Sequence, residues 1–115
     1  MIKIYHNPRC TKSRQGLQAL ESSGEQFEII KYLDTIPTKE ELKKVLKSLN
    51  MPAELLVRKN EAIWKENFRG KELSEDEIIE AMIKYPKLIE RPIVIKGNKA
   101  VIGRPTEKIH ALLKQ

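Results

Sequence analysis

Residues 2–32 read IKIYHNPRCTKSRQGLQALESSGEQFEIIKY, and this stretch predicts a strand, a helix and a second strand in that order. Residues 2–5 have strand character, and the Asn-Pro pair at 7–8 ends the run. Leu17 and Leu20 then share a helical face, and Gly24 is a typical residue to end a helix. Because Phe27–Tyr32 again has strand character, we expect a βαβ unit with a parallel strand pair and a right-handed crossover.

The middle of the chain predicts helices only. Two capping boxes, each a Thr or Ser followed three residues later by Glu, precede apolar helical faces: Thr38 with Glu41, and Ser74 with Glu77. A shorter helical turn is expected from Pro52 to Leu56. Residues 60–73 carry no such pattern, so we expect them, together with the 35–37 connection, to be irregular or mobile.

The last third of the chain predicts a hairpin and a final helix. Residues 93–95 and 100–102 are apolar strand-like runs joined by Gly97-Asn98, and Pro105 opens a helix with apolar residues at 109, 112 and 113. The predicted strands therefore bracket the helical block. This order predicts an α/β fold of the thioredoxin type, a mixed four-stranded sheet with flanking helices and a helical insertion at about residues 38–88.

The composition fits a single domain over residues 1–115. Of the 115 residues, 40% are hydrophobic and 33% charged, and a division into two domains would leave neither with enough core. No apolar run approaches the roughly 18 residues that span a bilayer, and the start lacks the features of a secretory signal. We therefore expect a cytoplasmic, monomeric protein without a membrane partner.

The positive charge is spread over the chain. Lys and Arg number 22 against 16 Asp and Glu, which gives a net charge of +6. Many lysines alternate with glutamates, as in residues 39–44, which is typical of a solvated helix surface. No basic patch is interleaved with aromatic residues, so no nucleic-acid partner is expected. The arginines are placed differently, since Arg9 and Arg14 flank the only cysteine.

That cysteine, Cys10, is the candidate nucleophile. It lies at the start of the first predicted helix, where unpaired backbone N–H groups and the helix dipole favour negative charge. His6 and Arg14 add positive charge or hydrogen bonds nearby, and Ser13 could donate its hydroxyl to the sulfur. An inert buried cysteine is the alternative. A lone cysteine excludes an intrachain disulfide, and no Cys/His set has the spacing of zinc ligands, so no metal is expected.

Four segments of the chain together match one pattern. The loop HNPRCTKSR occupies residues 6–14, and LLVRKN at 55–60, RPIV at 91–94 and GRPTE at 103–107 each carry an arginine. In this order they resemble the active-site loop, His-Asn-Pro-x-Cys-x-x-Ser-Arg, and the three arginine segments of the glutaredoxin-dependent arsenate reductases, the ArsC family. The matches cover the chain nearly end to end.

This resemblance implies a reaction. Cys10 would attack arsenate to form a thiol-arsenate adduct, held by Arg58, Arg91 and Arg104 as bidentate partners of its oxygens. Glutathione would then attack the adduct, arsenite would leave, and glutaredoxin would remove glutathione from Cys10. The expected partners are therefore an oxyanion such as arsenate, glutathione as co-substrate and glutaredoxin, with no bound cofactor.

The resemblance also implies further site residues. The fold would be thioredoxin-like, with Pro92 as the cis-proline that faces the cysteine in such folds. His6 and Ser13 are catalytic candidates beside the nucleophile, and Arg14 is an additional substrate-binding candidate because of its charge in the same loop.

Two other functions stay open. A monothiol, glutaredoxin-like oxidoreductase would need Cys10 but not the full set of arginines, so loss of activity in Arg58→Ala would argue against it. The family also resembles Spx, a regulator that binds RNA polymerase and senses oxidation through a Cys-x-x-Cys pair, but Ser13 stands in place of the second cysteine. Thr11 and Lys12 replace the Gly and Thr of the best-characterised arsenate reductases, which bears on the choice of substrate.

Overall fold

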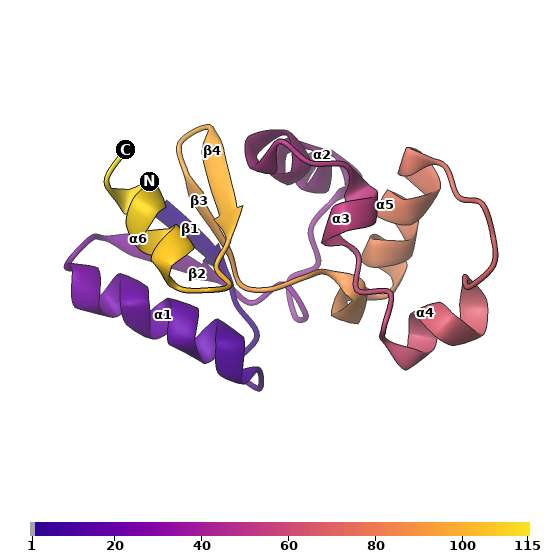
Figure 1. Cartoon of the computed structure of the whole chain (residues 1–115), viewed down its shortest axis with the longest axis horizontal. Helices are drawn as coiled ribbons and strands as arrows, with labels where there is room; N and C mark the ends of the chain where they lie inside the picture. The colour runs from indigo at the N-terminus through magenta and orange to yellow at the C-terminus, as the bar shows by residue number, and fades with distance from the viewer. Residues whose placement is uncertain (1) are drawn as a thin grey trace. The chain divides into compact units, whose positions relative to one another are not determined.

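The computed structural model describes residues 2–115 (Figure 1). Its elements follow the predicted order, with additional short helical segments in the middle of the chain. They are β1 (Ile2–Tyr5), α1 (Thr11–Ser23), β2 (Phe27–Ile30), α2 (Lys39–Leu49), α3 (Ala53–Leu56), α4 (Ala62–Asn67), α5 (Glu75–Lys84), the 3-10 helix η1 (Pro86–Leu88), β3 (Ile93–Lys96), β4 (Lys99–Ile102) and α6 (Glu107–Leu113).

The described residues divide into two compact units. The first, here called the sheet unit, comprises residues 2–35 and 91–115. The second, the helical unit, comprises Ile36–Glu90 and contains the insertion that the sequence predicts at about residues 38–88. All four strands belong to the sheet unit, so the chain leaves the sheet after β2 and returns to it at β3.

A mixed four-stranded sheet in the order β2-β1-β3-β4 forms the centre of the sheet unit. β1 pairs in parallel with β2, with Ile2 opposite Phe27, as the βαβ pattern predicts. β1 runs antiparallel to β3, with Ile4 opposite Val94, and β3 runs antiparallel to β4. Gly97 in the connecting turn has a φ of 62°, which glycine adopts without steric cost. The arrangement confirms the predicted fold class.

Helices α1 and α6 cover one face of this sheet. Their apolar side chains pack with those of β1 and β3 into one buried cluster: Ile2, Ile4, Leu20, Val94, Ile109 and Leu112. The two-residue period of the strands and the helical spacing of the others bring these side chains to one interface. This packing anchors α1, whose start carries the candidate cysteine, against the sheet.

The second predicted strand is shorter than expected. β2 ends at Ile30, and the N–H groups of Asp34 and Thr35 donate to the Lys31 carbonyl in a turn. Tyr32 is nevertheless fully buried, and its ring stacks on that of Tyr5 with 6.2 Å between centroids. The apolar character that predicts a strand at residue 32 therefore reflects burial in a turn.

Both predicted capping boxes form in the helical unit. The Thr38 side chain accepts a hydrogen bond from the Glu41 N–H, and the Ser74 side chain accepts one from the Glu77 N–H. Each glutamate in turn accepts from the N–H of its cap residue. The caps start α2 and α5, the two longest helices of this unit among the described residues.

Helix α4 overturns part of the expectation that residues 60–73 would be irregular or mobile, since residues 68–73 that follow it form turns and irregular structure. It spans Ala62–Asn67, and its Trp64 is buried. The Trp64 ring lies 5.1 Å from that of Phe68, which in turn meets Tyr85 edge-on at 6.1 Å. A short helix stabilised by such tertiary contacts needs neither a cap nor an amphipathic repeat, so the sequence pattern does not reveal it.

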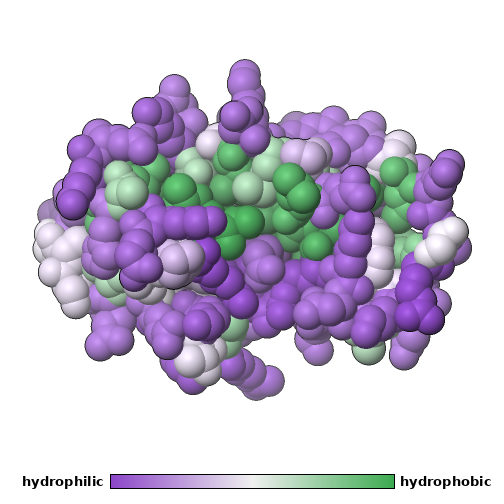
Figure 2. Space-filling model, in the orientation of Figure 1, coloured by the Kyte–Doolittle hydropathy of each residue, from purple (hydrophilic) through white to green (hydrophobic). Residues whose placement is uncertain are grey.

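The surface seen in Figure 2 is mainly hydrophilic. On α2, Lys39 lies 3.2 Å from Glu80 and Lys43 lies 3.5 Å from Asp76, both on α5. These partly exposed pairs contribute about 0–1 kcal/mol each, as expected for a solvated helix surface. Within residues 2–115, no helix has the length and apolar character needed to cross a membrane.

Candidate active site

Cys10 is the N-cap residue of α1, at the end of the loop that follows β1. The Cys10 N–H donates to the Asn7 carbonyl at 3.0 Å, and the Arg14 N–H donates to the Cys10 carbonyl at 2.9 Å, which begins the helix. The sulfur is therefore placed where the first backbone N–H groups of a helix have no carbonyl partner within it. The cysteine residue is partly exposed.

His6 and Ser13 form a buried polar pair in the same loop. His6 is 4% exposed and Ser13 is fully buried. His6 Nδ1 lies 2.8 Å from Ser13 Oγ, which also accepts a hydrogen bond from the Asn7 N–H at 2.9 Å. The donation of the Ser13 hydroxyl to the Cys10 sulfur stays a prediction; the group of Ser13 that acts on the thiol here is its backbone N–H. The His6–Ser13 pair ties the start of the loop to the first turn of α1.

Two of the predicted arginines reach Cys10 from the far end of the chain. Arg104 Nη2 lies 3.6 Å from the sulfur, and the Arg91 side chain hydrogen-bonds the same sulfur. Arg104 Nε also donates to the Arg91 carbonyl at 2.7 Å, which links the two residues. Each arginine precedes a proline in a cis peptide bond, Arg91–Pro92 and Arg104–Pro105. The structure thus brings two permanent positive charges to one thiol.

The surroundings of Cys10 favour its thiolate. Burial has the largest single influence and raises the pKa of the thiol. The Ser13 backbone N–H, the Arg91 guanidinium and the Lys12 backbone N–H oppose it, and together they hold the pKa of Cys10 below its usual value. Hydrogen bonds and a nearby cation both stabilise the charged form of a thiol. A larger fraction of this cysteine is therefore nucleophilic at neutral pH than of a free cysteine.

His6 contributes a hydrogen bond rather than a charge. Burial lowers the pKa of His6 below its usual value; the interaction with Ser13 raises it in part, and the charges of Lys31 and Arg14 lower it again. The imidazole is consequently neutral at pH 7. Of the two roles that the sequence leaves open for His6, hydrogen bonding is the one that this environment favours.

Arg14 supports the loop to which it belongs. Its Nη1 donates to the Pro8 carbonyl at 2.9 Å, and its Nη2 donates to Thr11 Oγ1 at 3.2 Å. Two of the donors of this guanidinium are therefore directed at the chain around Cys10. Thr11, one of the departures from the best-characterised arsenate reductases, supplies the second acceptor.

Two glycines that the sequence did not single out allow Pro92 to pack closely. A Cβ on Gly16 of α1 would lie 2.7 Å from Pro92 Cγ, and one on Gly103 would lie 3.1 Å from the same atom and 2.7 Å from Ile109. The Gly103 N–H also donates to the Pro92 carbonyl at 2.8 Å. At Gly16 the nearest atom belongs to the rigid Pro92 ring, so a side chain does not fit there, whereas at Gly103 the nearest atom is the flexible end of Ile109. No local sequence signal reports such a close approach.

Arg58, the third predicted arginine, belongs to the helical unit, directly after α3. Its Nη1 lies 3.5 Å from Glu61 Oε2 and its Nε lies 3.6 Å from Glu90 Oε1. The Arg58 side chain is 15% exposed. It is therefore a largely buried cation held between two carboxylates.

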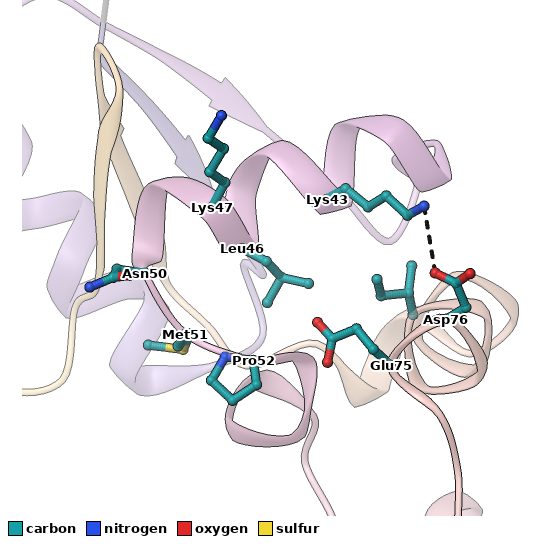
Figure 3. A pocket seen from close by; sticks show the side chains of 9 residues that line it. Lys43, Leu46, Lys47, Asn50, Met51, Pro52, Glu75 and Asp76 are labelled. Carbon is teal, nitrogen blue, oxygen red and sulfur yellow. Dashed lines mark ion pairs between the residues drawn. The ribbon is translucent and has the colours of Figure 1, made fainter.

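A cavity of about 490 Å³ also opens in the helical unit, lined mainly by residues of α2 and α5 (Figure 3). Its polar groups serve the packing of the helices. Lys43 pairs with Asp76 across it, and both carboxylate oxygens of Glu75 accept from the Ala53 N–H at 3.0 and 3.1 Å. No predicted site residue lines it. Over residues 2–115, no cluster of three or more His, Cys, Asp or Glu side chains could hold a metal ion.

Comparison with known proteins shows which family the chain resembles. The family model described as the ArsC family matches residues 5–112. The chain is 46% identical over 110 residues to the uncharacterized protein YfgD of Escherichia coli strain K12, covering 94% of this chain and 92% of YfgD. It is 43% identical over 114 residues to an arsenate reductase of Neisseria meningitidis, covering 97% of each.

The solved structures give the same result. The arsenate reductase from Vibrio cholerae superimposes with a TM-score of 0.91 at 43% sequence identity, covering 96% of this chain and 95% of that one. The family-model match extends over the cysteine loop and over the segments of all three arginines. The chain therefore belongs to the ArsC family.

Proposed function

We propose that this protein is an arsenate reductase with Cys10 as its nucleophile. The observation that carries the proposal is the pairing of a thiol of lowered pKa with two arginines, Arg91 and Arg104, at one sulfur. Arsenate is anionic at neutral pH, so bringing it to a thiolate requires several positive groups. The arsenate reductases among the relatives of this chain support the identity of the oxyanion.

The proposed reaction begins at the Cys10 sulfur. The thiolate attacks arsenic, a sulfur–arsenic bond forms, and one arsenate oxygen leaves as water after protonation. A glutathione thiolate then attacks the Cys10 sulfur, and the sulfur–arsenic bond breaks with its electron pair remaining on arsenic, which leaves as arsenite. Two thiols have become a Cys10–glutathione disulfide, and arsenic has gained two electrons. Glutaredoxin takes over the glutathione by thiol–disulfide exchange and regenerates Cys10.

The other site residues receive supporting roles. Arg58, Arg91 and Arg104 bind the arsenate oxygens, a proposal that rests for Arg58 on the family pattern. His6 and Ser13 position the loop, since their bond joins its start to α1. The reducing electrons come from external thiols, so the scheme needs no bound cofactor and suits the reducing cytoplasm.

The test is NADPH consumption in a mixture of arsenate, glutathione, glutaredoxin and glutathione reductase. We expect turnover that depends on arsenate and that disappears in Cys10→Ser. Arsenate-dependent turnover by the serine variant would contradict the nucleophile assignment. Absence of arsenate-dependent turnover in the native protein, with a reactive Cys10 thiol, would favour a general monothiol oxidoreductase that uses the same thiolate on glutathionylated substrates.

A further inference from the structure

Arg58 is held in a frame of backbone hydrogen bonds. Its N–H donates to the Leu88 carbonyl at 2.7 Å, and the Glu90 N–H donates to the Leu56 carbonyl at 3.1 Å, on either side of an antiparallel bridge between Val57 and Ile89. In such a pair, residues on either side of the bridge share one face, and diagonal neighbours with long side chains can meet. Arg58 and Glu90 are diagonal neighbours of this kind.

The second carboxylate is fixed by a turn. The Glu61 N–H donates to the Arg58 carbonyl at 3.3 Å, and Glu61 is the N-cap residue of α4. The Cα positions of Arg58, Glu61 and Glu90 are thus all set by main-chain bonds. The two glutamate side chains are 30% and 27% exposed, so they are more exposed than the guanidinium that they flank, whose side chain is 15% exposed.

The distances from the Arg58 guanidinium to the two carboxylates show whether its N–H donors are already used in short hydrogen bonds. A guanidinium–carboxylate hydrogen bond has a donor–acceptor distance of about 2.7–2.9 Å. The two contacts of Arg58 are longer, at 3.5 and 3.6 Å, whereas the neighbouring exposed pair of Lys59 with Glu54 closes to 2.8 Å. The carboxylates therefore balance the charge of the buried guanidinium, which would otherwise favour a position in water. At these distances they do not form short hydrogen bonds with its N–H donors.

We infer that Glu61 and Glu90 are positioning residues that hold the Arg58 guanidinium ready to bind the oxyanion. The inference rests on the proposed function, in which Arg58 is an oxyanion ligand. Without the two carboxylates the guanidinium leaves its fixed place, and the oxyanion loses one preorganised bidentate partner. We expect the effect to fall on binding, because the proposed reaction gives neither glutamate a part in the chemistry at sulfur and arsenic.

The experiment compares Glu61→Gln/Glu90→Gln with the native protein and with Glu54→Gln. Glu54 is a matched control, since it is an exposed glutamate that pairs with Lys59, the residue after Arg58. We expect the KM for arsenate to rise about tenfold in the double variant with kcat changed less than about twofold, and both to stay native in Glu54→Gln. Melting temperatures show that each variant folds. If Glu61→Gln/Glu90→Gln does not fold, Glu61→Gln alone takes its place in the comparison.

A mutant cycle separates action through Arg58 from a general structural effect. If the glutamates act through the arginine, adding their substitutions to Arg58→Ala leaves kcat/KM unchanged, whereas independent effects would multiply. A multiplicative loss in the triple variant would overturn the inference. So would an unchanged or lowered KM in a folded Glu61→Gln/Glu90→Gln.

Protection of Cys10 from iodoacetamide by arsenate gives a readout that needs no turnover. We expect the half-protecting arsenate concentration to rise by the same factor in the double variant. If arsenate protects Cys10 in the native protein but no turnover occurs, the proposed function fails. The positioning role is then still supported if the half-protecting arsenate concentration rises in the double variant. If turnover occurs but both readouts are native in the double variant, the positioning role fails alone. If arsenate neither protects nor turns over, Arg58 binds no such oxyanion and both fail.

Discussion

Arg104 Nη2 lies 3.6 Å from the Cys10 sulfur, although 94 residues separate the two in sequence. The sheet order explains how they meet. β1, which leads into the Cys10 loop, is the direct neighbour of β3, and β4 pairs back on β3 before the chain reaches Arg104. The whole helical unit is inserted between these strands in sequence. The site is therefore a product of sheet topology rather than of any local motif.

The planar guanidinium of Arg91 and of Arg104 should contribute to arsenate binding through its shape as well as through its charge. We expect Arg91→Lys and Arg104→Lys each to lower kcat/KM for arsenate about tenfold or more, because a lysine cannot form a bidentate pair with an oxyanion. Steady-state kinetics in the coupled assay measure this. Arg69→Lys, an exposed arginine outside the site, serves as the matched control. Native kcat/KM in both site variants would argue against oxyanion binding by these residues.

The pKa of Cys10 should depend on Arg91. The Arg91 guanidinium is one of the groups that lower this pKa, so Arg91→Met should raise it. The pH profile of iodoacetamide alkylation reports the thiolate, and its midpoint should move to higher pH in the variant. Below that midpoint, the variant should react more slowly than the native protein at the same pH. An unmoved midpoint would show that the Arg91 guanidinium does not contribute to stabilising the thiolate.

The neutral state of buried His6 predicts a loss of stability in acid. Its pKa is lowered in the folded protein, so as the pH falls the unfolded chain takes up a proton first. The contribution of neutral His6 to the free energy of unfolding is therefore complete above the pKa of the unfolded chain, about 6.5. It is lost as the pH falls through the lowered pKa of the folded protein. Urea unfolding from pH 7.5 to 5 should show a steeper loss of stability in the native protein than in His6→Asn, which keeps a hydrogen-bonding side chain beside Ser13. Parallel curves would contradict a neutral buried imidazole.

Gly16 should not tolerate a methyl group. Its Cβ would meet the rigid Pro92 ring at 2.7 Å, so Gly16→Ala should destabilise the protein by about 1–3 kcal/mol despite the better helix propensity of alanine. Gln18→Ala, at an exposed position of the same helix, should change stability by less than about 0.5 kcal/mol. The free energy of unfolding in urea measures both. A stabilised Gly16→Ala would mean that Pro92 can move away at little cost.

Local patterns predicted most of the fold. Strand alternation, two capping boxes and the Gly97 turn each depend on neighbours in sequence, and the structure confirms all of them. α4 was missed because its helix depends on the packing of Trp64 with Phe68. The predicted extension of the second strand to Tyr32 failed for a similar reason, since burial of that ring against Tyr5 does not require a strand.

The candidate site also has features that the sequence predicted and features that it did not. The sequence nominated Cys10, and the structure places it at the predicted helix start beside Arg91 and Arg104. The contacts of Ser13 Oγ with His6 and Asn7 were not predicted, because the sequence does not show which groups of the loop meet once it folds. The frame around Arg58 was missed altogether, since its carboxylates come from separate segments.

The most direct test of the account is the intact mass of the protein after incubation with arsenate and glutathione in the absence of glutaredoxin. We expect one glutathione to accumulate on the native chain as a disulfide with Cys10, only when arsenate is present, and arsenite to appear in equal amount. Cys10→Ser should remain unmodified. Glutathione bound equally without arsenate, or arsenite released by Cys10→Ser, would contradict the proposed role of Cys10.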